Sequence, residues 1–293
     1  MSVPDLSISQ NFLTDTKLVR QLALKAGISK DDTVLDIGAG KGIITEVLAG
    51  LAGSVISLEL DPKLHTELKE KFSAHSHVQS LNENFLLHPL PLKTYKVFSN
   101  IPFSITSLIV NKLLFTGRVP EDTFLVVQKE AADRFMGKGE GYLFSLLTQP
   151  FFDFSVFYKF KREDFTPRPL VDVVMLRIRK KREPLITRDL RDEYLDFICY
   201  VVNQQKPTLK LRLNRLFTAI QYYRISDELK FSVTSKVKDL TFSQWLLLFE
   251  RYVFFVDREK KSITDGSYAN YRKVTSGSNK VTRTKVRRPL QIN

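Results

Sequence analysis

Short apolar runs alternate with amphipathic stretches along the first half of the chain. Residues 14–27 are predicted to form a helix because Leu18, Leu22 and Ala26 fall on one stripe. Beyond them, apolar runs predict strands at 33–37, 54–59, 77–81, 95–99 and 122–128, and the segments between them predict helices at 42–51, 62–74 and 104–116. This alternation predicts an α/β fold, a parallel sheet with helices on both faces.

The second half of the chain changes character twice. Residues 151–161 and 171–179 predict two further strands that complete the sheet, and Pro184 marks a boundary. From 188 to 256 the apolar spacing is helical throughout. Beyond 257 the chain is poor in large apolar residues and carries a net charge of +8, so we expect it to be mostly disordered. We therefore predict three regions, a sheet domain at 1–183, a small all-helical domain at 184–257 and a basic tail at 258–293.

Composition narrows the class of protein. A chain of 293 residues with 43% hydrophobic content can bury the cores of one large and one smaller domain. Its net charge of +13 indicates a polyanionic partner, most simply nucleic acid, although a solvated basic surface is the alternative. The single cysteine, Cys199, excludes an internal disulfide, and its apolar helical surroundings favour a core position. Without a signal peptide or membrane-spanning run, a cytoplasmic protein is expected.

The residues Asn100-Ile101-Pro102-Phe103 follow a predicted buried strand and are suited to holding a flat ring that bears an amine. The Asn100 side-chain oxygen and a backbone carbonyl can both accept hydrogen bonds from one exocyclic NH2 group. Pro102 fixes its own φ angle, and Phe103 can stack on the ring. Two acceptors on one amine turn its lone pair toward an electrophile, so this corner indicates an enzyme that alkylates an aromatic amine.

A glycine-rich turn upstream indicates where the electrophile binds. The strand at 33–37 leads into Gly38-Ala-Gly40-Lys-Gly42, and glycines at a strand-to-helix turn let backbone approach a ligand closely. Glu59 ends the second strand, where an acid can take the hydroxyls of a ribose. The Gly-x-Gly-x-Gly spacing after Asp36 favours S-adenosylmethionine over a dinucleotide. Alone, such a turn is also compatible with a chance loop or another nucleotide fold.

These residues resemble one known family in their order along the chain. The segments Ser9-Gln-Asn-Phe-Leu13, Asp36 to Gly42, Glu59, Asn100 to Phe103 and Phe165-Thr-Pro-Arg-Pro169 are similar to those of the erythromycin-resistance (Erm) 23S rRNA adenine-N(6) methyltransferases. The resemblance covers roughly residues 5 to 256. Small-subunit rRNA adenine dimethyltransferases are close relatives, but the opening motif and Ile101 favour the Erm group. The resemblance implies a Rossmann-like methyltransferase fold with a seven-stranded, mostly parallel sheet and a helical C-terminal domain.

The resemblance also implies roles for individual residues. Cofactor binding is expected of Gln10, Asn11, Leu13, Asp36, Gly38, Gly40, Glu59, Leu60, Asn84 and Asn100. Catalytic contacts to the flipped adenine are expected of Asn100, Ile101, Pro102, Phe103 and Phe165, with the two phenylalanines flanking the base. Asn84 stands where the family usually has Asp, and its side chain can still accept a bond from the cofactor's adenine. No metal is expected, because the four histidines are scattered.

Basic residues around the cleft and on the helical part are candidates for contacts to RNA phosphates. They are Lys129, Arg134, Lys138, Lys161, Arg162, Arg168, Lys210 and Arg212. Each one alone is better explained as a solvated surface charge, whereas together they fit phosphate binding. Arg283, Lys285, Arg287 and Arg288 in the tail are expected to add nonspecific attraction.

The resulting expectation is a monomeric enzyme that methylates an adenine of 23S rRNA and confers resistance to macrolide, lincosamide and streptogramin B antibiotics. One alternative is a small-subunit rRNA dimethyltransferase that acts in ribosome assembly. Another is a non-catalytic RNA-binding factor with this fold, against which the intact Asn100–Phe103 corner argues. A DNA adenine methyltransferase is disfavoured, since such enzymes commonly have Asp where this chain has Asn100.

Overall fold

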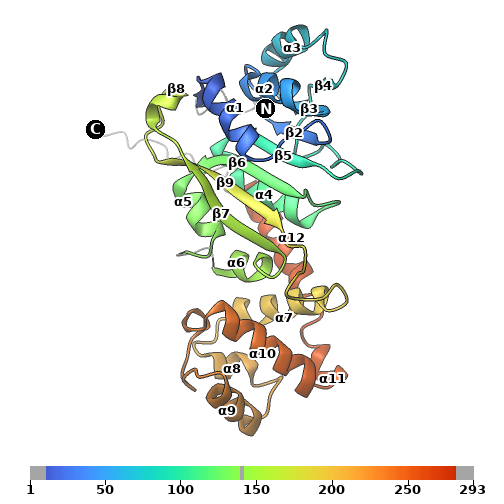
Figure 1. The fold of residues 1–293 in the computed structure, drawn as a ribbon. Helices are drawn as coiled ribbons and strands as arrows, with labels where there is room; N and C mark the ends of the chain where they lie inside the picture. Colours follow the sequence, from blue (N-terminus) through green and yellow to red (C-terminus); the bar gives the residue numbers. More distant parts are fainter. Residues whose placement is uncertain (1–10, 139–141, 282–293) are drawn as a thin grey trace, which may run out of the picture. The chain divides into compact units, whose positions relative to one another are not determined.

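The computed structural model describes residues 11–138 and 142–281 and divides the chain into two compact units (Figure 1). Unit 1 comprises the chain through Gly141 together with Phe151–Pro184, and unit 2 comprises Tyr142–Pro150 and the chain from Leu185 onward. Across the described ranges, no helix combines the length and apolar character needed to cross a bilayer.

Unit 1 is built on a seven-stranded mixed sheet in the order β4-β3-β2-β5-β6-β9-β7. Its strands are β2 (Thr33–Ile37), β3 (Ser54–Leu58), β4 (Val78–Leu81), β5 (Lys96–Asn100), β6 (Asp122–Gln128), β7 (Phe152–Lys159) and β9 (Val173–Lys180). The first five strands pair in parallel, whereas β9 pairs antiparallel with both β6 and β7. The predicted methyltransferase sheet is confirmed, including the two late strands that complete it.

The helices of unit 1 connect these strands. They are α1 (Thr16–Lys25), α2 (Ile43–Leu51), α3 (Pro62–Lys71), α4 (Thr106–Phe115) and α5 (Lys129–Phe135), with short 3-10 turns at Phe103–Ile105 and Arg162–Asp164. Local chemistry fixes their starts: the Asp61 carboxylate accepts the amides of Lys63 and Leu64, and Pro62 occupies the first helical position. Helix α5 follows β6 directly and was not predicted from the sequence.

The order of the strands places a topological switch point between β2 and β5. From β2 the chain proceeds outward to β3 and β4, then returns to form β5 on the other side of β2. Ligands bind at such points in doubly wound sheets, at the carboxyl ends of the strands. Here those ends carry the Asp36–Gly38 segment and Asn100.

A second, two-stranded sheet brings together two distant motifs of unit 1. Strand β1 (Phe12–Leu13) pairs antiparallel with β8 (Phe165–Thr166), in the register Phe12 to Thr166 and Leu13 to Phe165. The pairing places the opening motif of the chain next to the loop that contains Phe165.

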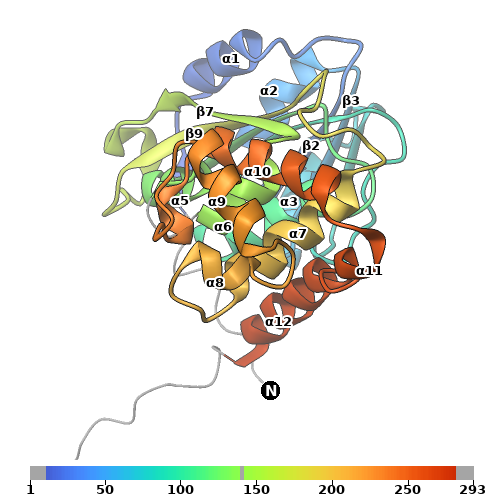
Figure 2. The same ribbon diagram turned by 90° about the horizontal axis from the view of Figure 1, so that it is seen from below.

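Unit 2 is entirely helical and is seen from below in Figure 2. Its helices are α6 (Tyr142–Thr148), α7 (Arg191–Asn203), α8 (Leu209–Leu213), α9 (Ala219–Glu228), α10 (Phe242–Phe255), α11 (Arg258–Lys261) and α12 (Ser267–Val281), with a 3-10 turn at Val237–Asp239. Aromatic rings form its centre: Phe197 of α7 contacts Trp245, Phe249 and Tyr252 of α10 at centroid distances of 6.5, 5.7 and 4.5 Å.

The observed division differs from the predicted one at residues 142–150. These residues group with unit 2 because the Tyr142 hydroxyl donates to the Val237 carbonyl at 2.7 Å and accepts the indole N–H of Trp245. The Tyr194 hydroxyl likewise donates to the Leu146 carbonyl at 2.8 Å. The helical unit is therefore assembled from two stretches of chain that flank β7–β9.

The prediction that disorder begins at 258 is wrong for 258–281, which forms α11 and α12. Two physical features explain the difference, hydrogen bonds at the start of α12 and partial burial of Tyr268 and Tyr271 where α12 packs on α7. The Asp196 carboxylate accepts the backbone N–H groups of Gly266 and Tyr268 at 3.0 and 2.8 Å, which fixes the start of α12 beside α7. Residues 282–293 lie outside the described residues.

Candidate active site

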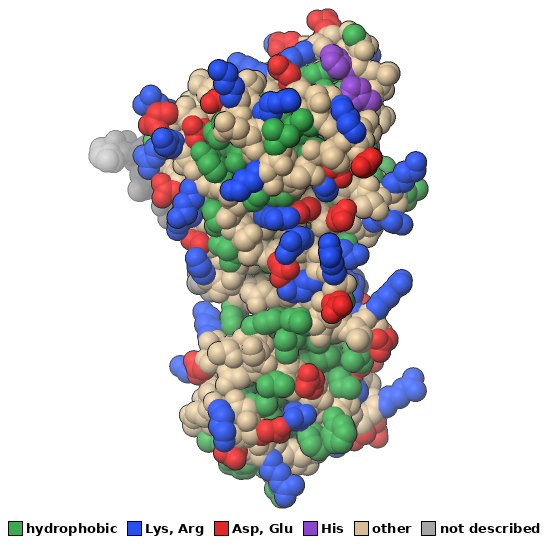
Figure 3. Space-filling model, viewed as in Figure 1, with side chains coloured by type: hydrophobic (Ala, Val, Ile, Leu, Met, Phe, Trp, Pro, Cys, Tyr) green, Lys and Arg blue, Asp and Glu red, His purple; other side chains and the backbone are tan. Residues whose placement is uncertain are grey.

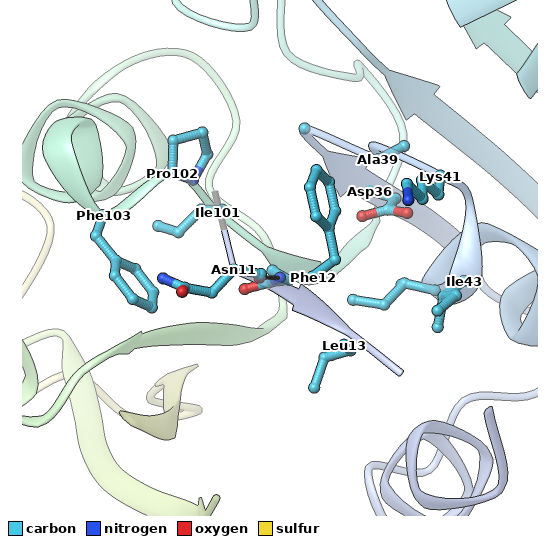
Figure 4. Close-up of a pocket in the computed structure, with 13 residues that line it drawn as sticks. Asn11, Phe12, Leu13, Asp36, Ala39, Lys41, Ile43, Ile101, Pro102 and Phe103 are labelled. Carbon is cyan, nitrogen blue, oxygen red and sulfur yellow. Dashed lines mark hydrogen bonds between the residues drawn. The ribbon is translucent and has the colours of Figure 1, made fainter. Parts of the chain in front are cut away.

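One pocket in unit 1 gathers most of the predicted site residues at the switch point (Figure 4). Strand β1, the glycine turn, the start of α2 and the corner after β5 each contribute to its wall. The lining residues are Asn11, Phe12, Leu13, Asp36, Gly38, Ala39, Lys41, Ile43, Ile44, Asn100, Ile101, Pro102 and Phe103.

The corner after β5 is held by a bond between its first residue and β1. Asn100 donates from its side-chain nitrogen to the main-chain oxygen of Asn11 at 2.7 Å. This contact assigns the amide orientation, so the Asn100 side-chain oxygen remains an acceptor. Ile101 is buried, while Phe103 is half-buried at the start of the 3-10 turn. The corner thus presents an acceptor and an aromatic ring in one wall of the pocket.

The glycine turn approaches Phe12 closely. Gly40 has a φ angle of +55°, and a Cβ atom at this position would lie only 2.7 Å from Cε1 of Phe12. The Lys41 ammonium lies 5.6 Å from the centroid of the same ring. Figure 4 shows the ring between Pro102 and the turn that carries Ala39 and Lys41. Sequence reasoning did not single out Phe12, although it belongs to the opening motif.

Asp36 is the buried acid of the pocket, with 1% of its surface exposed. Its Oδ2 accepts the hydroxyl of Thr45 at 2.7 Å, whereas its Oδ1 is buried and has no hydrogen-bond partner. Burial raises the pKa of Asp36 to about 7, the Thr45 hydrogen bond opposes this rise, and the charge of Glu59 adds to it. A buried carboxylate oxygen without a partner in a pocket wall suits a cationic donor.

Glu59 directly follows β3, and its carboxylate holds the glycine turn through a hydrogen bond with the backbone of Gly40. It is 2% exposed, and its two oxygens accept the backbone N–H groups of Gly40 at 2.7 Å and Asp61 at 2.9 Å. A carboxylate has lone pairs beyond these two bonds, so the predicted ribose contact stays a prediction. Leu60 next to it is 47% exposed, as a surface that packs on an adenine requires.

Asn84 follows β4 with its side-chain oxygen already engaged. That oxygen accepts the backbone N–H of Leu86 at 2.9 Å. The oxygen keeps one further lone pair, so the predicted bond to the cofactor's adenine stays a prediction. Gln10, the remaining predicted cofactor residue, lies outside the described residues.

Phe165 does not lie where its predicted role requires. The ring is 2% exposed and packs edge-on against Phe160 at a centroid distance of 5.3 Å. Its pairing with Leu13 across β1 and β8 places it in the core of unit 1. A base cannot stack on a ring that is covered in this way, so of the two predicted aromatic contacts Phe103 alone has an exposed ring surface.

The predicted RNA-binding residues of unit 1 are exposed, but several are paired. Lys129 and Lys138 both contact Asp133, at 2.8 and 2.9 Å, and these contacts lower the pKa of Asp133. Arg162 lies 3.8 Å from Asp172. Arg134, Lys161 and Arg168 are exposed on the same unit. Figure 3 shows basic side chains interspersed with acidic ones on the visible face of this unit.

The two predicted RNA-binding residues of unit 2 differ from each other. Lys210 lies over the ring of Tyr223, 4.5 Å from its centroid, and donates to its hydroxyl at 2.7 Å. Arg212 instead donates to the carbonyls of Val201 and Val202 at 2.9 and 2.6 Å, near the end of α7. Part of its guanidinium thus satisfies helix carbonyls that would otherwise lack partners, and the predicted RNA contact of Arg212 stays a prediction.

The pocket combines three features, which are a glycine turn at the switch point, a buried acid beside it and an Asn-Ile-Pro-Phe corner on the adjacent strand. Together they define an S-adenosylmethionine-dependent methyltransferase. The ribosomal RNA adenine dimethylase family matches residues 5–253, and the chain belongs to this family. Enzymes of this family use S-adenosylmethionine to methylate ribosomal RNA adenine, and the chain is one of them.

Several relatives match most of this chain. An rRNA adenine N-6-methyltransferase of Bacillus anthracis is 31% identical over 255 residues, which cover 86% of this chain and 88% of that protein. The crystal structure of 23S rRNA methyltransferase ErmE matches with a TM-score of 0.74 at 30% identity, covering 83% of this chain and 100% of that chain. Ribosomal RNA small subunit methyltransferase A of Moorella thermoacetica is 32% identical over 231 residues, 73% of this chain and 80% of that protein.

Proposed function

We propose that this enzyme methylates the exocyclic amine of one adenine in 23S rRNA, and that the added bulk in the peptide exit tunnel region confers resistance to macrolide, lincosamide and streptogramin B antibiotics. The observation that carries the chemistry is the Asn100 side chain, held by Asn11 with its oxygen as an acceptor in the pocket wall. The choice of 23S rRNA is supported by the similarity to ErmE along the whole of that chain.

The pocket fits S-adenosylmethionine on the evidence of its own residues. The unpartnered Oδ1 of Asp36 suits the ammonium at the amino-acid end, and the glycine turn admits a ligand against its backbone. Glu59 and Leu60, at the end of β3, would hold the ribose and the adenine. When bound, the cofactor supplies an activated methyl group, so positioning is the main task left to the protein.

The corner then acts on the target base. Asn100 and a backbone carbonyl accept the two hydrogens of the adenine amine, which orients the nitrogen lone pair. Phe103 offers a stacking surface, and stacking contributes about 1–3 kcal/mol per base, enough to offset much of the cost of extruding an adenine from its RNA stack. No histidine lines the described pocket, and the activated donor needs none as a general base.

The exposed basic residues of unit 1, with Lys210 of unit 2, would hold the RNA backbone through contacts whose strength falls with salt. We also propose that the enzyme acts as a monomer in the cytoplasm. A second candidate function is methylation of small-subunit rRNA, which is favoured by the 32% identity to the Moorella thermoacetica protein.

One experiment separates the two. The chain and its Asn100→Ala variant are expressed in a macrolide-sensitive bacterium, erythromycin resistance is measured, and primer extension maps blocked adenines on 23S and 16S rRNA. We expect resistance and a new stop on 23S rRNA with the unaltered chain alone. A stop on 16S rRNA without resistance would replace the first proposal by the second.

A further inference from the structure

Behind the pocket wall lies a buried cluster of hydroxyl groups that contacts none of the corner residues. The Thr45 hydroxyl, on the first turn of α2, donates to Oδ2 of Asp36 at 2.7 Å and lies 2.9 Å from the Ser57 hydroxyl of β3. Thr45 and Ser57 are both 0% exposed. The contact therefore occupies one carboxylate oxygen and leaves the other, Oδ1, without a partner in the residues that line the pocket.

We propose that Thr45 is a positioning residue for the cofactor: its hydroxyl, oriented by Ser57, favours the ionised form of the Asp36 carboxylate and turns it so that Oδ1 receives the cofactor's ammonium group. The inference rests on the assignment of S-adenosylmethionine to this pocket and adds a residue that does not itself line it. Thr45 suits the task because a β-branched side chain has few χ1 rotamers, so the hydroxyl stays directed at one oxygen.

The charges around Asp36 explain why such a residue is needed. Burial and the nearby Glu59 carboxylate both favour the protonated form of Asp36 and raise its pKa to about 7. Lys41, which lines the same pocket, has its ammonium over the Phe12 ring, 5.6 Å from the ring centroid. The Thr45 hydroxyl and the nearby Ser99 side chain both lower the pKa, and Thr45 donates to Oδ2 at hydrogen-bond distance. Removing the Thr45 hydroxyl takes away a hydrogen bond that favours the ionised form, so Asp36 should stay protonated to a higher pH than in the unaltered chain.

The chain offers a matched control in the same unit. Thr123 of β6 is also 0% exposed, and its hydroxyl is buried with no hydrogen-bond partner. Thr123→Val therefore makes the same isosteric change as Thr45→Val without removing a hydrogen bond. Thr45→Ser is the conservative variant, because it keeps the hydroxyl and removes only a methyl group.

The test measures ligand affinity rather than turnover. Isothermal calorimetry with S-adenosylhomocysteine, between pH 6 and pH 8, is compared with 5′-methylthioadenosine, which keeps the nucleoside and lacks the ammonium. For the unaltered chain and Thr123→Val we expect affinity for S-adenosylhomocysteine to rise about tenfold over this range, as Asp36 ionises. For Thr45→Val the rise shifts to higher pH by about one unit, so affinity at pH 7 falls several-fold to tenfold, and Thr45→Ser largely restores it.

Affinity for 5′-methylthioadenosine should be the same in all four proteins. Equal losses for both ligands, or a loss in Thr45→Val that is the same at every pH, would make Thr45 a merely structural residue and overturn the inference. Unchanged affinity of Thr45→Val for S-adenosylhomocysteine at pH 7 would overturn it as well. Failure of the unaltered chain to bind S-adenosylhomocysteine at all would instead remove the cofactor assignment on which the inference stands.

Discussion

The side-chain nitrogen of Asn100 donates to the main-chain oxygen of Asn11, so the end of β5 is tied directly to the short strand β1. Strand β1 in turn pairs with β8, and the three segments lie together although they are far apart in the sequence. Because this bond uses the side-chain nitrogen of Asn100 as a donor, the side-chain oxygen is left to accept hydrogen bonds in the pocket. The bond also makes the corner depend on the opening motif of the chain, which explains why both motifs occur together in one site.

Gly40→Ala should disturb the pocket through Phe12. A Cβ atom at this position would meet the Phe12 ring at 2.7 Å, and the positive φ angle adds a backbone cost of about 1–2 kcal/mol. We expect affinity for S-adenosylhomocysteine, measured by calorimetry, to fall at least about tenfold. Gly27→Ala is the control, since Gly27 has a φ angle of +71° and no atom within 4 Å of the added Cβ. Equal affinities for the two variants would show that the contact with Phe12 has no effect.

Stability should depend on pH through Asp36. Its pKa is raised to about 7 in the folded chain from an ordinary value of 3.8, so the folded state binds this proton more tightly than the unfolded state. The stabilisation is fully present below about pH 4 and is lost as the pH rises through 7. Between pH 5 and pH 8 the free energy of unfolding of the ligand-free chain should fall by about 3 kcal/mol from this group. Urea unfolding of Asp36→Asn should lack this fall, and parallel curves for the two proteins would contradict the assignment.

Alanine substitutions of Arg212 and Lys210 should have different effects on the free energy of unfolding. Arg212→Ala leaves the carbonyls of Val201 and Val202 without their donor, and we expect a loss of about 1.5–3 kcal/mol in thermal or urea unfolding of the helical unit. Lys210→Ala removes a contact with the exposed Tyr223 ring and should stay within about 0.5 kcal/mol of the unaltered chain. An Arg212→Ala variant of normal stability that binds RNA poorly would contradict the structural role and favour the predicted RNA contact of Arg212.

Residues 282–293 should contribute to RNA affinity through their positive charge and should have no effect on the methylation rate. Because 258–281 forms helices, the informative truncation removes 282–293, which carries Arg283, Lys285, Arg287 and Arg288. The slope of log affinity against log salt for rRNA fragments should decrease by up to about 3, and the methylation rate at saturating RNA should not change. The full-length chain with those four residues changed to Gln should behave in the same way. An unchanged slope in both variants would exclude this segment from RNA binding.

Periodicity located the sheet of unit 1 because its central strands are buried on both faces and read as short apolar runs. Strand β2 at Thr33–Ile37 and strand β6 at Asp122–Gln128 occur at the predicted bounds. The corner at Asn100 and the turn at Gly38 could be recognised because each needs unusual residue types at fixed spacing. The pocket confirms that they meet at one place.

Other features depend on contacts that no local pattern encodes. Two-residue strands such as β1 and β8 exist only through their pairing. The burial of Phe165 follows from that pairing, whereas the family resemblance implied a ring that flanks the target base. Helix α12 begins on hydrogen bonds to Asp196, which is 70 residues from Gly266, so its polar composition was read as disorder.

The central claim is that Asn100 holds the target amine and contributes little to cofactor affinity. Two measurements on the same protein test this claim directly. Single-turnover transfer of a labelled methyl group from S-adenosylmethionine to 23S rRNA gives the transfer rate, and calorimetry with S-adenosylhomocysteine gives the cofactor affinity. For Asn100→Ala we expect the transfer rate to fall by about a hundredfold or more, equivalent to about 3 kcal/mol, with cofactor affinity within a few-fold of normal. A variant that transfers methyl groups at the normal rate would contradict the account.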